Sequence, residues 1–296
     1  MSLVPVYRPR PSPLHAARAG ATAALCGAFA LVCAIYEHPL VLAGVLVAVL
    51  GAGLAAGVGA ELARAARLSV PLALLIALVN PLVYQGGDTL LLRGGTFLGR
   101  RFDVTLEALA AGGLAGLRVI AFLMAFGLFS ACVDPDELLR LFRRVSYRSA
   151  LTASLATRLV PVLARDALRM GDAARCRPEP PGRLAVTRAA LAGALDRAVD
   201  VAAALEVRGY SRGGRPSRGA PRPWSRHDVR VLCAAALLAW SAVGARVLGV
   251  GLVELYPALQ VPIGAGEGVL IGVIAVSSLL PFAGAGARLG VVARAG

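Results

Sequence analysis

Long apolar runs alternate along the chain with segments that are rich in arginine, glycine and proline. A helix needs about 20 apolar residues to cross the hydrocarbon core of a bilayer. The predicted spans are Ala19–Tyr36, Pro39–Ala60, Leu68–Tyr84, Ala108–Val133, Val231–Val253 and Gly268–Gly286. The pattern therefore predicts an all-α, polytopic membrane protein with about six spans.

A short helix and then a long one are predicted directly after the fourth span. Asp134 precedes Pro135, and an acidic N-cap followed by proline at the first helical position favours a helix start. The long helix runs from about Tyr147 to Arg177, and Pro161 inside it predicts a kink because proline lacks the backbone N–H. Its apolar positions recur at helical spacing, at Leu163, Ala167, Met170 and Ala174.

A second long helix spans roughly Arg183–Arg208. Gly209 follows it, where a left-handed cap would end the helix. We expect Arg197 and Asp200 to face away from its apolar stripe. That stripe comprises Leu184, Leu191, Leu195, Ala198, Ala202 and Leu205.

Four segments follow from this reading of the chain. Residues 1–133 form an N-terminal membrane domain with four spans, and residues 134–210 hold a pair of long helices. Residues 211–228 are a basic, Pro/Gly-rich linker. Residues 229–296 carry the C-terminal spans.

Between the third and fourth spans, Gln85–Glu107 is polar and predicts an external segment. Its residues 89–97 look like a short hairpin around a turn at Gly94-Gly95. Thr105 is then placed to cap the fourth membrane helix.

Composition supports the membrane assignment. The chain is 57% apolar with a mean hydropathy of +0.71, and only 16% of its residues are charged. Soluble domains carry about 25% charged residues. This chain has too little polar surface to cover itself in water.

All 31 basic residues are arginine, because the sequence contains no lysine. A phosphate-binding loop of the G-x-x-x-x-G-K-[ST] type and a Schiff-base lysine are therefore excluded. We expect a non-catalytic chain, so that any ATP hydrolysis takes place in a partner.

Arginine content also predicts the orientation. With the N-terminus in the cytoplasm, 26 arginines fall in cytoplasmic segments and four outside, and Arg118 lies within a span. Arginine-rich segments stay on the cytoplasmic side. We expect a multi-pass protein of the inner (plasma) membrane with both long helices in the cytoplasm.

Metal and cofactor sites are not expected. The five cysteines lie far apart, no C-x-x-C pair occurs, and the three histidines are scattered. The cysteines are interpreted as small apolar core residues.

Arg118 is costly near the middle of a span, by about 2.5–3.5 kcal/mol on insertion scales. Such a residue usually turns toward protein. We expect a structural role for Arg118, through an ion pair or a hydrogen bond to a carbonyl, rather than contact with a substrate.

Both long helices end in a small or apolar residue followed by arginine, as Ala174-Arg175-Cys176 and Val207-Arg208-Gly209. Arginine at a helix C-terminus is favoured by the helix dipole alone. Alternatively, each guanidinium projects from a rigid helix end into an acidic groove of a partner, where it can hold a carboxylate through two hydrogen bonds.

These features together resemble the transmembrane (T) component of energy-coupling factor (ECF) ABC-type transporters, the CbiQ/EcfT-like family of importers for vitamins and transition-metal ions. The resemblance covers roughly Glu37 to Tyr210. The motifs that carry it are residues 37–40, 80–82 followed by 86–88, 117–118, 134–139, 158–163 and 204–210.

This resemblance implies a transmembrane coupling subunit. Motif arginines Arg175 and Arg208, with Ala174 and Gly209 beside them, would dock into two ABC ATPase subunits. Movements of the ATPases would then reach a substrate-binding membrane (S) component in the bilayer. The chain departs from the family pattern at Cys176, where glycine is usual, and at Val207, where alanine is usual.

Two other function classes remain open. An ABC permease that binds substrate itself would need polar groups in a central cavity, and the spans offer few besides Arg118, Asn80 and Ser277-Ser278. A polytopic membrane enzyme would need clustered carboxylates. Asp134 and Asp136 come closest, but Pro135 between them favours a helix cap. Nucleic-acid binding is not expected, because the positive-inside rule accounts for the arginines.

Overall fold

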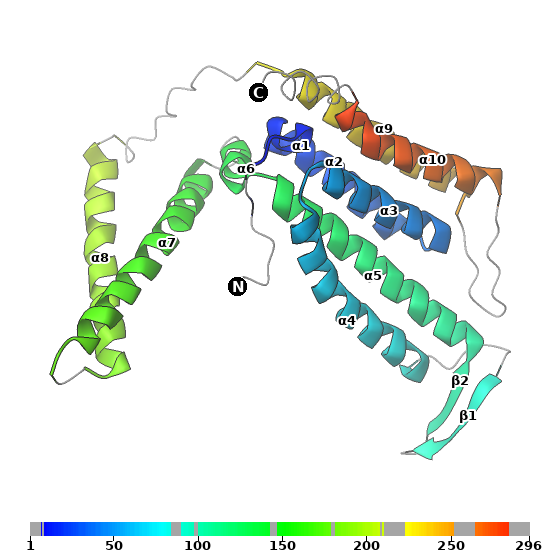
Figure 1. The fold of residues 1–296 in the computed structure, drawn as a ribbon, viewed down its shortest axis with the longest axis horizontal. Helices are drawn as coiled ribbons and strands as arrows, with labels where there is room; N and C mark the ends of the chain where they lie inside the picture. The colour runs from blue at the N-terminus through cyan, green and yellow to red at the C-terminus, as the bar shows by residue number, and fades with distance from the viewer. Residues whose placement is uncertain are drawn as a thin grey trace, which may run out of the picture. The chain divides into compact units, whose positions relative to one another are not determined.

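The computed structural model describes residues 7, 9–83, 90–97, 100–142, 147–178, 181–207, 209, 223–251 and 264–283. The chain divides into two compact units (Figure 1). The first combines Met1–Pro135 with Trp224–Gly296, and the second is Asp136–Pro223. The N-terminal and C-terminal membrane segments therefore belong to one unit.

Seven helices of the first unit lie in its described part. They are α1 (Pro13–Ala16), α2 (Ala19–Ile35), α3 (Pro39–Ala55), α4 (Gly59–Val83), α5 (Leu106–Cys132), α9 (Arg226–Val247) and α10 (Ala265–Leu279), with a 3₁₀ turn, η2 (Leu280–Phe282), after α10. Four segments are long and apolar enough to cross a membrane, within α4, α5 and α9 and across α10–η2, while α2 and α3 are apolar but shorter. The prediction of a helical membrane protein is confirmed.

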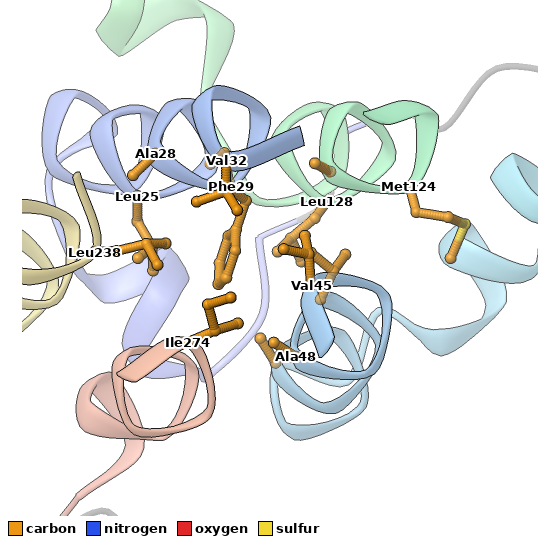
Figure 2. Close-up of a cluster of buried hydrophobic side chains, with 14 of the residues drawn as sticks. Leu25, Ala28, Phe29, Val32, Val45, Ala48, Met124, Leu128, Leu238 and Ile274 are labelled. Carbon is orange, nitrogen blue, oxygen red and sulfur yellow. The ribbon is translucent and has the colours of Figure 1, made fainter. Parts of the chain in front are cut away.

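The core of this unit forms where α2, α3, α5, α9 and α10 meet (Figure 2). Phe29 of α2 points toward Ile274 of α10, and both side chains are buried. Val45, Leu128 and Leu238 contribute from α3, α5 and α9. Lipid tails are as apolar as these side chains, so close van der Waals packing is what holds such helices together.

Glycines bring α4 and α5 into close contact. A Cβ on Gly116 would lie 2.9 Å from the carbonyl oxygen of Ala73, and one on Gly127 would lie 2.7 Å from the Cβ of Ala65. Both separations are shorter than side chains tolerate. These glycines therefore allow the two backbones to approach, as small residues do between membrane helices.

The third predicted span begins too late. Helix α4 starts at Gly59, nine residues before Leu68. Arg64 and Arg67 suggested a loop, but Glu61 in the first helical turn accepts hydrogen bonds from Arg10 at 2.7 Å and Arg64 at 3.5 Å. These pairs compensate charges that would otherwise disfavour an early start.

The predicted hairpin exists, but its turn lies elsewhere. Strands β1 (Leu90–Phe97) and β2 (Arg100–Thr105) are antiparallel, and Phe97 pairs with Arg100. Gly94 and Gly95 lie inside β1, at a register irregularity between Arg93 and Thr96. Glycine accommodates such a bulge. The predicted cap is confirmed, since the Ala108 N–H donates to the Thr105 hydroxyl at 3.3 Å.

The second unit contains α6 (Pro135–Phe142), which begins at the unit boundary, α7 (Tyr147–Arg175) and α8 (Arg183–Val207). Met170 approaches Gly193, and Asp166 approaches Arg197, so the two long helices run antiparallel. The apolar stripe of α8 is not what meets α7 at its leucines: Leu184, Leu191 and Leu195 are exposed. Arg197, which was predicted to face away from that stripe, contacts α7.

Candidate partner-docking site

Arg175 is the last residue of α7 and is strongly exposed. Its side chain is 82% exposed, and its guanidinium lies 3.4 Å from the carboxylate of Asp172, one turn earlier. An exposed pair of this spacing contributes only about 0.3–0.5 kcal/mol. The Arg175 side chain can therefore exchange Asp172 for another carboxylate at little cost. Ala174 beside it is half-buried.

Helix α8 ends at Val207, whose side chain is 90% exposed. Gly209 has φ +80°, and its N–H donates to the Glu206 carbonyl at 2.8 Å. This left-handed conformation favours glycine. Arg208 lies between these two positions in the sequence but outside the described residues. Helix α8 therefore ends at the position of the predicted Val207-Arg208-Gly209 motif.

The two helix ends lie at opposite ends of the α7–α8 pair (Figure 1). This follows from the antiparallel contacts, which place Arg197 beside Asp166 and Gly193 beside Met170. The arrangement gives two separate helix termini, one at each end of the pair.

Pro161 lies inside α7, and the helix continues through it. Pro161 cannot donate to the Thr157 carbonyl. Nearby, the Thr157 hydroxyl donates to the Ser154 carbonyl at 3.1 Å, and Arg165 Nε donates to the Pro161 carbonyl at 3.1 Å. The site is a local weak point in the helical hydrogen-bond ladder.

Asp134 immediately precedes α6, which begins at Pro135 as predicted. Asp136 and Glu137 occupy the first turn of α6, and Arg140 occupies its last turn. Acids at the N-terminus and a base at the C-terminus both match the helix dipole. This placement explains the acidic cluster without an enzymatic role.

Arg118 lies well inside α5 and reaches the end of α2. Its Nε donates to the Cys33 carbonyl at 2.8 Å, its Nη2 donates to the Ala34 carbonyl, and its Nη1 pairs with Glu37 at 2.9 Å. The last carbonyls of a helix lack intrahelical donors. Arg118 therefore supplies donors for the C-terminus of α2.

A family model matches residues 12–218, and it describes CbiQ, a cobalt transport protein. The chain belongs to the CbiQ family. No curated protein matches the chain. As a CbiQ-family member, the chain is a membrane transport component. The matched segment contains α7 and α8 and ends before α9, so the last two membrane helices lie outside it.

An ionic network that the sequence reading missed lies at the start of α2 and α9. The Arg18 N–H donates to Asp228 at 2.6 Å, and Asp228 is fully buried. Asp228 also accepts from the Ser225 N–H at 2.8 Å, which completes a capping box for α9. The guanidinium of Arg18 lies 4.7 Å from the Trp224 ring centre. The Ser225-x-x-Asp228 spacing was a readable signal, but its partner lies 210 residues away.

The described part of this CbiQ-family chain holds no group of three or more His, Cys, Asp or Glu residues arranged for a metal ion. Glu267 is buried, and its carboxylate accepts the N–H groups of Gly251 at 3.1 Å and Gly264 at 2.8 Å. Its oxygens therefore join the end of α9 to the start of α10. Cys26, Cys33 and Cys132 are buried, as predicted, whereas Cys176 and Cys233 are exposed.

Proposed function

We propose that this CbiQ-family chain is the transmembrane coupling subunit of an ECF-type ABC importer. The supporting observation is the pair of long helices α7 and α8, which leave Arg175 exposed at one terminus and Val207 exposed at the other. In this proposal Arg175 and Arg208 are the docking arginines, and Ala174 and Gly209 shape the two helix ends.

The chemistry of docking follows from the guanidinium group. A planar guanidinium can hold a carboxylate through two parallel hydrogen bonds, which fixes orientation as well as distance. Because the chain has no lysine, it has no phosphate-binding loop of its own. ATP is therefore hydrolysed in two partner ABC ATPase subunits, one for each helix terminus.

Transmission requires helices with two discrete arrangements. Movement of the ATPases displaces the termini of α7 and α8, and the membrane unit passes this movement to a substrate-binding S component in the bilayer. Pro161 is a hinge in this scheme, and Asp134 is the structural residue at the start of α6. Arg118 has a structural role, because its contacts are all to the end of α2 and to Glu37.

The substrate in this proposal is a transition-metal ion or a vitamin. The family description favours cobalt. Arginine distribution supports an orientation with the N-terminus, α7 and α8 in the cytoplasm and the chain embedded in the inner (plasma) membrane.

A tagged full-length chain purified from its native membrane tests this function. We expect two ABC ATPase subunits and a small membrane protein to co-purify, identified by mass spectrometry. A chain that purifies without any ATPase yet restores cobalt uptake would contradict the proposal.

A further inference from the structure

The contact between α7 and α8 depends on one ion pair more than on apolar burial. Arg197 Nη1 lies 2.6 Å from Asp166 Oδ2, and both side chains are partly buried. By contrast, none of the described residues between Asp136 and Val207 is fully buried. Because so little apolar surface is buried between the two helices, the polar contact determines the angle at which they cross.

Small residues surround this ion pair on α8 and leave room for movement. Ala190, Gly193 and Ala194 face Leu163 and Met170 of α7 around a cavity of about 300 Å³. A Cβ on Gly193 would lie 3.7 Å from Met170 Cε, which is an ordinary contact distance. The helices therefore touch without interlocking, and they can rotate about the contact.

The ion pair lies at similar distances along the chain from the two motif arginines. Nine residues separate Asp166 from Arg175, and eleven separate Arg197 from Arg208. At 1.5 Å per residue, each arm is about 14–17 Å long. A change of about 10° in crossing angle then moves each arm's end by about 2–3 Å.

We infer that the Asp166–Arg197 ion pair is the pivot that sets the crossing angle of α7 and α8, and so the directions in which the two docking ends point. Asp166 and Arg197 are positioning residues in this view, since neither reaches a helix terminus. The inference rests on the proposed function for its significance, but the geometry can be measured without any partner.

Spin-label distance measurements on the full chain test the pivot. Labels are placed at Ala173→Cys on α7 and Ala189→Cys on α8, which are exposed positions on the same side of the ion pair, with Cys176 and Cys233 replaced by serine. We expect Asp166→Asn and Arg197→Gln each to shift the mean distance by about 2 Å or more and to broaden its distribution. The charge-swapped double variant, Asp166→Arg with Arg197→Asp, should restore the original distribution.

Asp196→Asn is the matched control, because it removes a neighbouring exposed acid from α8 without touching the ion pair. An unchanged distance distribution in both single variants overturns the pivot, whatever the ATPases do. A shifted distribution supports the pivot even if Arg208→Glu leaves ATPase binding intact, and that second result would count against the proposed function alone.

Discussion

Arg118 Nη1 lies 2.9 Å from Glu37 Oε1, which joins the interior of α5 to the turn between α2 and α3. Two further bonds from the same guanidinium reach the carbonyls of Cys33 and Ala34. Two of these three hydrogen bonds of Arg118 therefore go to carbonyls at the C-terminus of α2, and one goes to the Glu37 carboxylate. Glu37 is 53% exposed, so its share of the interaction is screened.

This asymmetry predicts unequal effects of removing the two partners. Glu37→Gln should cost at most about 1 kcal/mol, as exposed ion pairs do. Arg118→Met should cost about 1.5–3 kcal/mol, because hydrogen bonds to a charged donor are lost and carbonyls lose their donors. Arg118→Lys should fall between them, since an ammonium cannot reproduce the planar fork. Thermal unfolding in detergent, monitored through labelling of the buried thiols, ranks the three variants by loss of stability. Equal losses of stability for Glu37→Gln and Arg118→Met would contradict the prediction.

The glycine contacts between α4 and α5 predict a second stability difference. Gly116→Ala should lower stability by about 1–3 kcal/mol, because its Cβ would lie 2.9 Å from a backbone carbonyl that cannot move aside alone. Gly113→Ala is the control, since nothing lies within 4 Å of its added Cβ. That variant should be neutral or slightly stabilising, because alanine favours helix formation over glycine by about 1 kcal/mol. The same thermal assay compares the two variants. A Gly116→Ala variant with unchanged stability would contradict the close approach of α4 and α5.

Arg208→Glu should abolish co-purification of the ATPases. Reversing the charge places a carboxylate against the acidic groove that the proposal assigns to the partner, and like charges in contact are strongly unfavourable. Arg165→Glu, at an exposed position in the middle of α7, carries the same charge change away from both docking ends. Quantitative mass spectrometry of the purified complex gives the readout. Normal ATPase recovery with Arg208→Glu would refute docking at this helix end.

Arg175→Ala should reduce transport-coupled ATP turnover while leaving membrane insertion unchanged. The physical reason is that Arg175 contributes little to the fold, being 82% exposed with one weak neighbouring pair. Arg158→Ala on the same helix is the control. ATP turnover by the reconstituted complex and the amount of chain in the membrane are measured together. Equal turnover in the Arg175 and Arg158 variants would leave Arg175 without its proposed role.

The isolated chain should bind neither cobalt nor a vitamin. The described residues contain no group of three metal-ligating side chains, and Glu267 is already engaged by two backbone N–H groups. Titration calorimetry with the purified chain measures this directly. Tight stoichiometric binding of Co²⁺ would favour a permease that recognises the substrate itself.

Much of the architecture is readable from the sequence because its signals are local. The Asp134-Pro135 start of α6, the Thr105 cap and the glycine after α8 each depend on neighbouring residues, and the structure has helix boundaries at these places. Apolar run length located the membrane helices for the same reason. The docking arginines came from helix-end position together with the family resemblance, and only one of them, Arg175, is among the residues that the structure describes.

What the sequence could not supply are contacts between distant segments. Arg197 was predicted to face away from the apolar stripe of α8, but its pairing with Asp166 turns that face toward α7 and leaves Leu191 exposed. The periodicity of apolar residues identifies one face of a helix, but it does not show which face a partner helix covers. The start of α4 was missed in the same way, because Glu61 pairs with Arg10 from before the first span.

The bond between Arg18 and Asp228 has a consequence for how the protein is made. The ribosome completes helices α2 to α8 before it synthesises α9 and α10. Until then Phe29 lacks its neighbours Leu238 and Ile274 (Figure 2). In a nascent chain that ends before Trp224, the surface around Phe29 would therefore face lipid or a membrane chaperone. The core of the first unit is complete only when α9 and α10, the last helices to be synthesised, pack against it.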